Sequence, residues 1–247
     1  MSKLVFTPKS KINKEASMDL ILAENINSLV GVLPAFDILL HFIQNSYLVK
    51  GLFATFILVV LLEIHKKGED SRLLKTCATL VVVFIAIFLG RILQMALPFS
   101  PRPLHTEGLE LTLVNGLKPD VLSNDSSFPS DHALMFFAMA CSVLCYHRLA
   151  GAVLLVHATV VISLPRLILG FHWMSDIAAG AILGGLLAFM LHPVITRWLS
   201  RSPLLAFRAS YPGPFHALLF ALLCETATMY QGSRQLLSFL ADLARLA

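Results

Sequence analysis

The strongest constraint on this chain is an uninterrupted apolar run near its C-terminal third. Residues 177–196 contain no Asp, Glu, Lys or Arg, and the run is bounded by Asp176 and Arg197. A helix needs about 20 mostly apolar residues to cross the hydrocarbon core of a bilayer. Only helices and closed barrels satisfy all their backbone hydrogen bonds there, and a barrel strand would alternate apolar with polar residues. The run therefore predicts a transmembrane helix.

Composition extends this prediction to the rest of the chain. Of the 247 residues, 57% are hydrophobic and 14% are charged, whereas a soluble domain is about 45–50% apolar and about 25% charged. This balance excludes an ordinary soluble domain and a disordered chain. We expect one all-α, polytopic transmembrane helical bundle over residues 1–247, with about six spans.

Five segments reach or approach spanning length, and two more are ambiguous. Residues 28–43 either span the bilayer or lie along its interface, so residues 1–46 are an amphipathic or first-span region. Residues 209–224 form a last span or a surface helix within a C-terminal helical extension, residues 209–247. The five clear segments are residues 47–64, 76–97, 132–147, 149–165 and 177–196. Lys50 lies near the start of the first of these segments and is interpreted as a lysine that snorkels to the interface.

Other features argue against alternative classes of protein. Residues 1–15 lack the apolar stretch of a cleavable signal peptide, so a later span is expected to direct insertion. The net charge is +4, but no nucleic-acid-binding motif is recognisable, so we expect membrane lipids rather than nucleic acid as partners. The cysteines lie in apolar stretches and are interpreted as packing residues, not as disulfides or metal ligands: Cys77, Cys141, Cys145 and Cys224.

The loops predict which way the bundle faces. Residues 65–75 and 197–208 are rich in Lys and Arg and fall on one side. The charged residues of segment 98–130, on the other side, are mostly acidic. Basic loops face the cytoplasm in membrane proteins. We therefore expect the acidic loop to lie on the outer side of an inner or plasma membrane.

Ionisable side chains gather at the outer ends of the predicted spans, where such residues usually mark a functional site. The arginines offer planar forks of donors that fit phosphate oxygens. One histidine can attack while the other carries a proton, and a carboxylate can set a tautomer. Each residue alone also has a simpler explanation as an interfacial anchor or a helix cap. The set comprises Arg102, Ser130, Asp131, His132, Arg166, His172 and Asp176.

The order and spacing of these residues resemble the type 2 phosphatidic acid phosphatase superfamily of membrane lipid phosphatases. That family shares a helical core with vanadium haloperoxidases and carries Lys-x6-Arg-Pro, Pro-Ser-Gly-His and Ser-Arg-x5-His-x3-Asp motifs. The corresponding pieces here are Arg102-Pro103, then Pro-Ser-Asp-His at residues 129–132, then Arg166-x5-His172-x3-Asp176. The resemblance covers a motif-bearing core, residues 76–196, and implies a single membrane-embedded phosphatase domain.

The resemblance also implies roles for individual residues. His172 would be the nucleophile that forms a phosphohistidine, Asp176 would orient it, and His132 would protonate the leaving oxygen. The family needs no metal or other cofactor. The phosphoryl oxygens would be bound by Arg102, Arg166 and Ser130.

Three positions depart from the family motifs. Met95 stands where the lysine is expected, and Arg91, one helical turn away, is the nearest candidate to replace it. Asp131 replaces glycine, so its carboxylate either turns away from the phosphate or stabilises the protonated form of His132. Pro165 replaces the serine before Arg166, which removes a hydroxyl.

The Phe-Pro-Ser-Asp-His stretch at residues 128–132 and the Gly-Phe-His-Trp-Met-Ser-Asp stretch at residues 170–176 most resemble the bacterial branch that acts on undecaprenyl pyrophosphate. Removal of the terminal phosphate of a polyprenyl pyrophosphate is therefore the expected activity. The alternatives are a phosphatase or phosphotransferase for phosphatidate, phosphatidylglycerol phosphate or lipid A. A non-catalytic membrane protein that binds or transports lipid is a further alternative.

Overall fold

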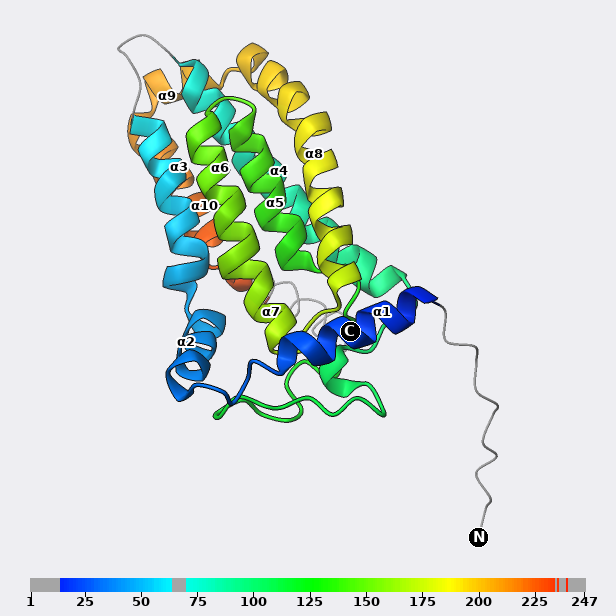
Figure 1. The fold of residues 1–247 in the computed structure, drawn as a ribbon. Helices are drawn as coiled ribbons and strands as arrows, with labels where there is room; N and C mark the ends of the chain where they lie inside the picture. The colour runs from blue at the N-terminus through cyan, green and yellow to red at the C-terminus, as the bar shows by residue number, and fades with distance from the viewer. Residues whose placement is uncertain (1–13, 64–69, 234, 236–238, 240–247) are drawn as a thin grey trace.

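A computed structural model describes residues 14–63, 70–233, 235 and 239, and the regular secondary structure in these ranges is helical (Figure 1). At the centre lies α5 (Asp131–Leu144), which packs against α4 (Ser71–Ala96), α6 (Arg148–His157) and α8 (Met174–Arg201). The predicted all-α bundle is confirmed. The signal-peptide prediction falls on residues 1–15, of which 1–13 lie outside the described residues.

The predicted number of spans, about six, is not confirmed. Three helices are long and apolar enough to cross a bilayer: α4, the continuous helix Arg148–Ile168, and α8. A fourth span requires α2 (Pro34–Asn45) and Leu48–Glu63 to count together, although they are bent by 71°. Two further apolar helices are shorter, α5 with 14 residues and α10 (Pro212–Ala227) with 16. The chain is an integral membrane protein, and its described residues contain three helices that are long and apolar enough to cross a bilayer, or four if the bent pair counts as one span.

The helix that contains Pro165 runs further than its sequence predicts. We expected the span to end at Pro165, but α6 continues through the π-helical turn η3 (Ala158–Ser163) into α7 (Leu164–Ile168). Proline lacks an N–H, and a π-helical turn changes which carbonyls the following residues use. Arg166 therefore lies in the last helical turn, buried, and not in a loop.

Glycines on α8 allow it to approach α5 closely, as their small-xxx-small spacing predicts. A Cβ atom on Gly180 would lie 2.6 Å from the carbonyl oxygen of Ser130, and one on Gly184 would lie 2.4 Å from that of Leu134. Neither position admits a larger side chain without movement of the backbone. This contact fixes the start of α5 against the start of α8.

One end of the bundle is covered by α1 (Lys14–Asn27) and by the long segment between α4 and α5, which includes the short helix η2 (Pro103–His105). In Figure 1, α1 lies across the bundle end beside α7 and α8. Asn27 joins these parts, because its amide donates to the carbonyl of Ile168 at 2.8 Å and its oxygen accepts from Thr112 N at 2.7 Å. The long segment is therefore an ordered cover.

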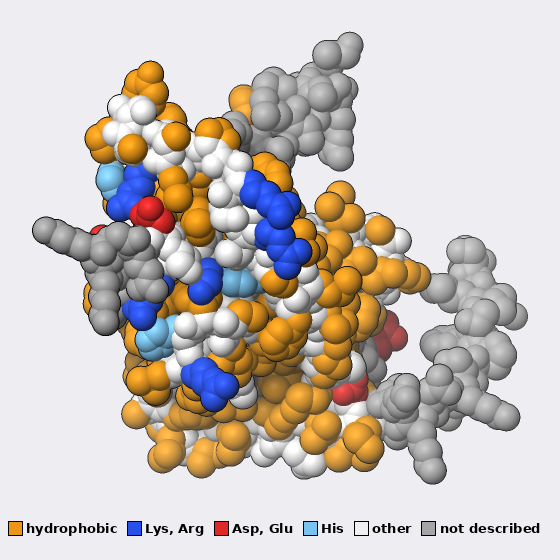
Figure 2. Space-filling model, turned by 90° about the horizontal axis from the view of Figure 1, so that it is seen from above, with side chains coloured by type: hydrophobic (Ala, Val, Ile, Leu, Met, Phe, Trp, Pro, Cys, Tyr) orange, Lys and Arg blue, Asp and Glu red, His pale blue; other side chains and the backbone are white. Residues whose placement is uncertain are grey.

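The opposite end of the bundle is basic. Figure 2 looks down on this end, where Lys and Arg side chains stand among hydrophobic ones. Here α8 ends and α9 (Leu204–Ser210) begins, and Arg208 pairs with Asp70 at 2.9 Å. The predicted loop residues Lys66 and Lys67 lie outside the described residues. The described cations at this end are Arg72, Lys75, Arg148, Arg197, Arg201 and Arg208.

Candidate active site

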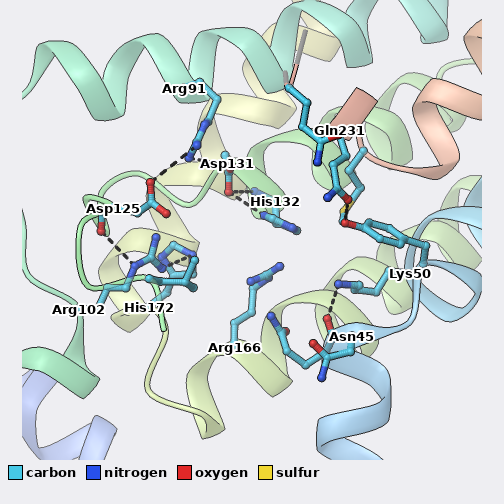
Figure 3. Close-up of a pocket in the computed structure, with 15 residues that line it drawn as sticks. Asn45, Lys50, Arg91, Arg102, Asp125, Asp131, His132, Arg166, His172 and Gln231 are labelled. Carbon is cyan, nitrogen blue, oxygen red and sulfur yellow. Dashed lines mark hydrogen bonds and ion pairs between the residues drawn. The ribbon is translucent and has the colours of Figure 1, made fainter. Parts of the chain in front are cut away.

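A cavity of about 480 Å³ opens at the covered end of the bundle (Figure 3). Its wall is built from segments that are far apart in the sequence: the bend after α2, the end of α4, the start of α5, the end of α7 and the turn before α8. Both candidate histidines and four cationic side chains line it: Lys50, Arg91, Arg102, His132, Arg166 and His172.

His172 lies in the turn between α7 and α8, where it is buried at the wall of the cavity. The ring atom Nδ1 is 2.9 Å from the carbonyl oxygen of Ser127. Because a carbonyl can only accept, Nδ1 carries the proton and Nε2 presents a lone pair. Nε2 is 3.3 Å from Nη1 of Arg102. The ring is thus held in the tautomer that a nucleophile requires, with a guanidinium beside the attacking atom.

The electrostatic surroundings keep His172 neutral. Burial lowers the pKa of His172. The positive charges of Arg102 and Arg166 lower this pKa further, whereas Asp176 raises it. Since an unperturbed histidine titrates near pH ~6.5, a lowered pKa leaves the lone pair available at neutral pH.

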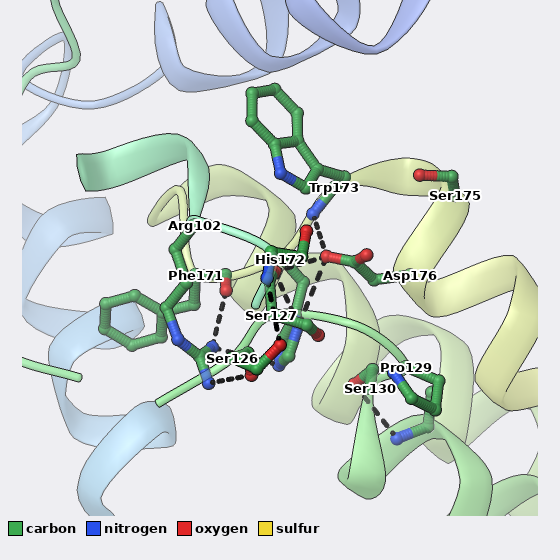
Figure 4. A network of polar contacts seen from close by, with 12 residues as sticks. Arg102, Ser126, Ser127, Pro129, Ser130, Phe171, His172, Trp173, Ser175 and Asp176 are labelled. Carbon is green, nitrogen blue, oxygen red and sulfur yellow. Dashed lines mark hydrogen bonds and ion pairs between the residues drawn. The ribbon is translucent and has the colours of Figure 1, made fainter. Parts of the chain in front are cut away.

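Asp176 lies in the first turn of α8, whereas His172 precedes this helix. The spacing of four residues would place both side chains on one helix face only if the helix began before His172, and α8 begins at Met174. Asp176 Oδ2 accepts from the backbone N–H of Trp173 at 2.8 Å and from the Ser127 hydroxyl, and it is 3.6 Å from Nδ1 of His172 (Figure 4). Asp176 therefore caps α8 and holds Ser127, whose carbonyl orients the histidine. The sequence motifs do not include Ser127, although it lies only two residues before the Pro-Ser-Asp-His motif.

Arg102 is fixed in place by three backbone carbonyls. Nε donates to Asp125 at 3.1 Å, Nη1 to Phe171 at 2.6 Å, and Nη2 to Ser126 at 3.2 Å. Burial lowers the pKa of Arg102, and nearby carboxylates oppose this effect. A guanidinium held rigidly in this way is pre-organised to receive a phosphoryl group at Nε2 of His172.

His132, at the start of α5, is oriented by its neighbour Asp131. The carboxylate oxygen Oδ1 of Asp131 is 2.7 Å from Nδ1 of His132 and accepts from the His132 backbone N–H at 2.8 Å. The other carboxylate oxygen is 3.8 Å from Arg91. The carboxylate thus holds the His132 ring at Nδ1 and faces Arg91, which leaves Nε2 of His132 as the ring atom available to a substrate.

The remaining predicted residues divide between the cavity and its supporting structure. Ser130 is fully buried as the N-cap of α5, where its hydroxyl accepts from Ala133 N at 3.4 Å. Arg91 lines the cavity, and its Nη2 lies 3.8 Å from Oδ1 of Asp125. Met95 is 87% exposed and does not line the cavity, so a side chain at this position is directed away from the cavity.

Lys50 was wrongly interpreted as a snorkelling lysine. Its side chain is 5% exposed and points into the cavity (Figure 3). The 71° bend between α2 and the next helix turns this part of the chain inward, and the sequence gives no sign of the bend.

Among the described residues, no group of three or more His, Cys, Asp or Glu is arranged to hold a metal ion.

The family of this chain follows from comparison with known protein families. Residues 75–200 match the model of the PAP2 superfamily, and they include every motif residue of the cavity wall described above. The chain belongs to the PAP2 superfamily. The resemblance inferred from the motifs is therefore confirmed.

The PAP2 chain is also similar to three named bacterial proteins. YbjG of Escherichia coli (strain K12), provisionally named an undecaprenyl-diphosphatase, is 48% identical over 67 residues, which are 27% of this chain and 31% of YbjG. The bacitracin transport permease protein BcrC of Bacillus licheniformis is 40% identical over 67 residues, 27% of this chain and 32% of BcrC.

The third similarity is longer. The lipid A 1-diphosphate synthase of Escherichia coli (strain K12) is 30% identical over 155 residues, which are 60% of this chain and 62% of the synthase. The chain thus spans about a third of YbjG and BcrC and under two thirds of the synthase. No solved structure matches this chain.

Proposed function

We propose that this protein is a membrane lipid phosphatase that removes the terminal phosphate of a polyprenyl pyrophosphate, with undecaprenyl pyrophosphate as the natural substrate. The observation that carries the proposal is the arrangement of His172: its Nδ1 is bound to a carbonyl, and its Nε2 lies beside Arg102 in a cavity that also contains His132. Two differently held imidazoles beside several cations suit transfer of a phosphoryl group.

In the first step, Nε2 of His172 attacks the terminal phosphorus. A P–N bond forms while the bond from phosphorus to the bridging oxygen breaks, and His132 gives its Nε2 proton to that departing oxygen. The lipid monophosphate leaves with the proton and the bond electrons. Arg102 and Arg166 stabilise the charge on the phosphoryl oxygens.

In the second step, water releases the phosphate. His132, now neutral, takes a proton from the water as the water oxygen attacks phosphorus. The P–N bond breaks, inorganic phosphate leaves, and the electron pair returns to Nε2 of His172. His132 is then protonated for the next cycle.

The distribution of charge supports an active site on the outer face of the membrane. The described cations at the end of the bundle opposite the cavity include Arg72, Arg197 and Arg201, and basic ends face the cytoplasm. The cavity would therefore open to the periplasm or the cell exterior, beneath the cover formed by α1 and the segment between α4 and α5.

Phosphate release from purified protein in detergent tests the proposal. The substrates are undecaprenyl pyrophosphate, phosphatidate, phosphatidylglycerol phosphate and lipid A, each with and without vanadate. We expect the fastest release from the pyrophosphate, inhibition by vanadate, and no measurable release by His172→Ala. A His172→Ala variant that retains the wild-type rate would contradict the mechanism.

A second candidate function is transfer of the phosphoryl group to another lipid. The 155-residue similarity to a protein named lipid A 1-diphosphate synthase favours it, because a phosphohistidine can be attacked by a lipid phosphate in place of water. An assay with undecaprenyl pyrophosphate that is radiolabelled on its terminal phosphate, with lipid A added, distinguishes hydrolysis from transfer. Label that appears on lipid A, and not in free phosphate, supports the transferase. Binding of lipid without any turnover supports a non-catalytic protein.

A further inference from the structure

Lys50 lies in the cavity wall but has no part in the steps above. It belongs to η1 (Leu48–Leu52), a π-helical turn that follows the bend after α2 and leads into α3 (Phe53–Glu63). Lysine is among the residues that are most rarely buried. A lysine that is 5% exposed in a membrane protein therefore calls for a partner.

The contacts of Lys50 within the described part of the chain are with uncharged groups. Its Nζ donates to the carbonyl of Gln44 and lies 5.3 Å from the centre of the Tyr47 ring. The ion pairs formed by the described carboxylates involve other cations. An ammonium has three donors, so Lys50 retains capacity to bind an anion that enters the cavity.

The backbone on both sides of Lys50 is fixed, which gives its side chain a defined direction. The Val49 carbonyl accepts from Nε2 of His157 on α6 at 2.9 Å. A Cβ atom on Gly51 would lie 1.8 Å from the carbonyl oxygen of Ala227, so η1 touches α10 directly. Leu48 and Leu52 on the same turn are exposed, so Lys50 occupies the inner side of η1.

Lys50 enters the cavity from the side opposite the nucleophile. In Figure 3, Arg102 and His172 lie on one side, Lys50 lies on the other, and Arg166 and His132 lie between them. A terminal phosphate at His172 would place its leaving oxygen toward His132. The group attached to that oxygen would then extend toward Lys50.

We propose that Lys50 forms a second phosphate subsite, which binds the phosphate that stays on the lipid and so selects lipid diphosphates over lipid monophosphates. The inference rests on the proposed function, since it takes the terminal phosphate to be bound at His172. Lys50 serves a different phosphate from the motif lysine that Met95 replaces. It acts as a specificity residue and not in the chemical steps.

The test compares two substrates with the same prenyl chain, a diphosphate and a monophosphate. Lys50→Met should lose about 10- to 100-fold in kcat/KM on the diphosphate, the usual effect of removing a charge-assisted contact, and should change little on the monophosphate. Lys50→Arg should keep most of the preference. Lys75→Met, at the basic end, is the matched control and should behave as wild type. Equal losses on both substrates, or no loss, would overturn the proposal.

A double variant distinguishes the second subsite from a replaced motif lysine. Because position 95 is 87% exposed and outside the cavity, Met95→Lys should not restore diphosphate activity to Lys50→Met. Full restoration would mean that Lys50 serves the terminal phosphate, and the proposal would be wrong.

A binding experiment separates this inference from the proposed function. The ligands are a prenyl methylene-bisphosphonate, which cannot be hydrolysed, and the matched prenyl monophosphonate. Wild type should bind the bisphosphonate more tightly, and Lys50→Met should lose that preference while keeping the wild-type Tm. If wild type hydrolyses neither substrate but shows this pattern, the phosphatase proposal fails and the Lys50 subsite stands. Equal Kd values in wild type and Lys50→Met would overturn the subsite.

Discussion

At the scale of single residues, the site depends on which atom holds each histidine. His172 is oriented by the Ser127 carbonyl at 2.9 Å, while the Asp176 carboxylate, 3.6 Å away, acts mainly on Ser127 and on the end of α8. His132 is oriented directly by Asp131. The two rings therefore have different supports, a neutral one for the proposed nucleophile and a charged one for the proposed acid.

The first prediction concerns the dependence of activity on pH. Protonated His172 cannot attack, and burial lowers its pKa, so kcat/KM should fall with acid only below about pH 6.5. Asp176 raises that pKa, so in Asp176→Asn the acid limb should move to lower pH, together with a lower kcat. The comparison cancels titration of the substrate, which is the same for both proteins. A limb that moves to higher pH would contradict the assignment.

A second prediction at this scale tests the Asp131–His132 pair. Asp131→Asn removes the charge that holds His132, and His132→Ala removes the proposed acid, so both should lower kcat on a lipid pyrophosphate, by about 10²–10⁴-fold for His132→Ala. An aryl phosphate with an acidic phenol needs no proton on its leaving oxygen. The first-turnover release of the phenol, which precedes the step in which His132 acts as a base, should therefore be much closer to wild type in both variants. Equal losses in the first-turnover rates on the two substrates would exclude an acid role.

At the scale of elements, close helix contacts and two π-helical turns place the cavity residues. The turn η1 carries Lys50, and η3 precedes the last turn of its helix, which carries Arg166. The start of α5 is pressed against α8 at Gly180 and Gly184, so Asp131 and His132 have a fixed position relative to the turn that holds His172. Small displacements of these helices should therefore change the site.

Paired glycines on α8 give a matched test of this contact. A Cβ atom on Gly184 would lie 2.4 Å from a backbone oxygen of α5, whereas one on Gly185 would meet only Cys141 Sγ at 3.7 Å. Gly184→Ala should lower stability by about 1–3 kcal/mol, as overpacking does, and Gly185→Ala should have little effect. The Tm of each variant in detergent measures this. Similar Tm values for both variants would show that the contact adapts.

At the scale of the whole molecule, the two ends of the bundle differ in charge and in structure. One end carries the cavity under an ordered cover tied together by Asn27, and the other carries short connections with Arg and Lys. The assignment of residues 1–247 to a single domain stays a prediction, as does the outer location of the site.

Labelling from one side of the membrane tests the orientation. In a variant without the four native cysteines, Lys118→Cys on the cover and Arg201→Cys at the basic end place one exposed thiol on each side. An impermeant maleimide should label position 118 in cells with an intact inner membrane and position 201 only after that membrane is permeabilised. The reverse pattern would place the cavity in the cytoplasm.

The sequence by itself determined the properties that depend on local chain chemistry. Apolar runs require helices in a bilayer, and these predicted the all-α bundle. The spacing of Arg102, residues 129–132, Arg166 and His172 predicted the family. Gly180 and Gly184 predicted a close helix contact. Each of these follows from a short stretch of chain, or from the order of such stretches.

Only the tertiary structure decided which groups meet. Ser127 and His172 are 45 residues apart, and Arg102 and His172 are 70 apart, so no local periodicity places them together. The bend after α2 brought Lys50 into the cavity, and the late start of α8 separated His172 from the helix face of Asp176. Sequence spacing fixes neighbours within one helix, whereas contacts between helices depend on how all of them pack.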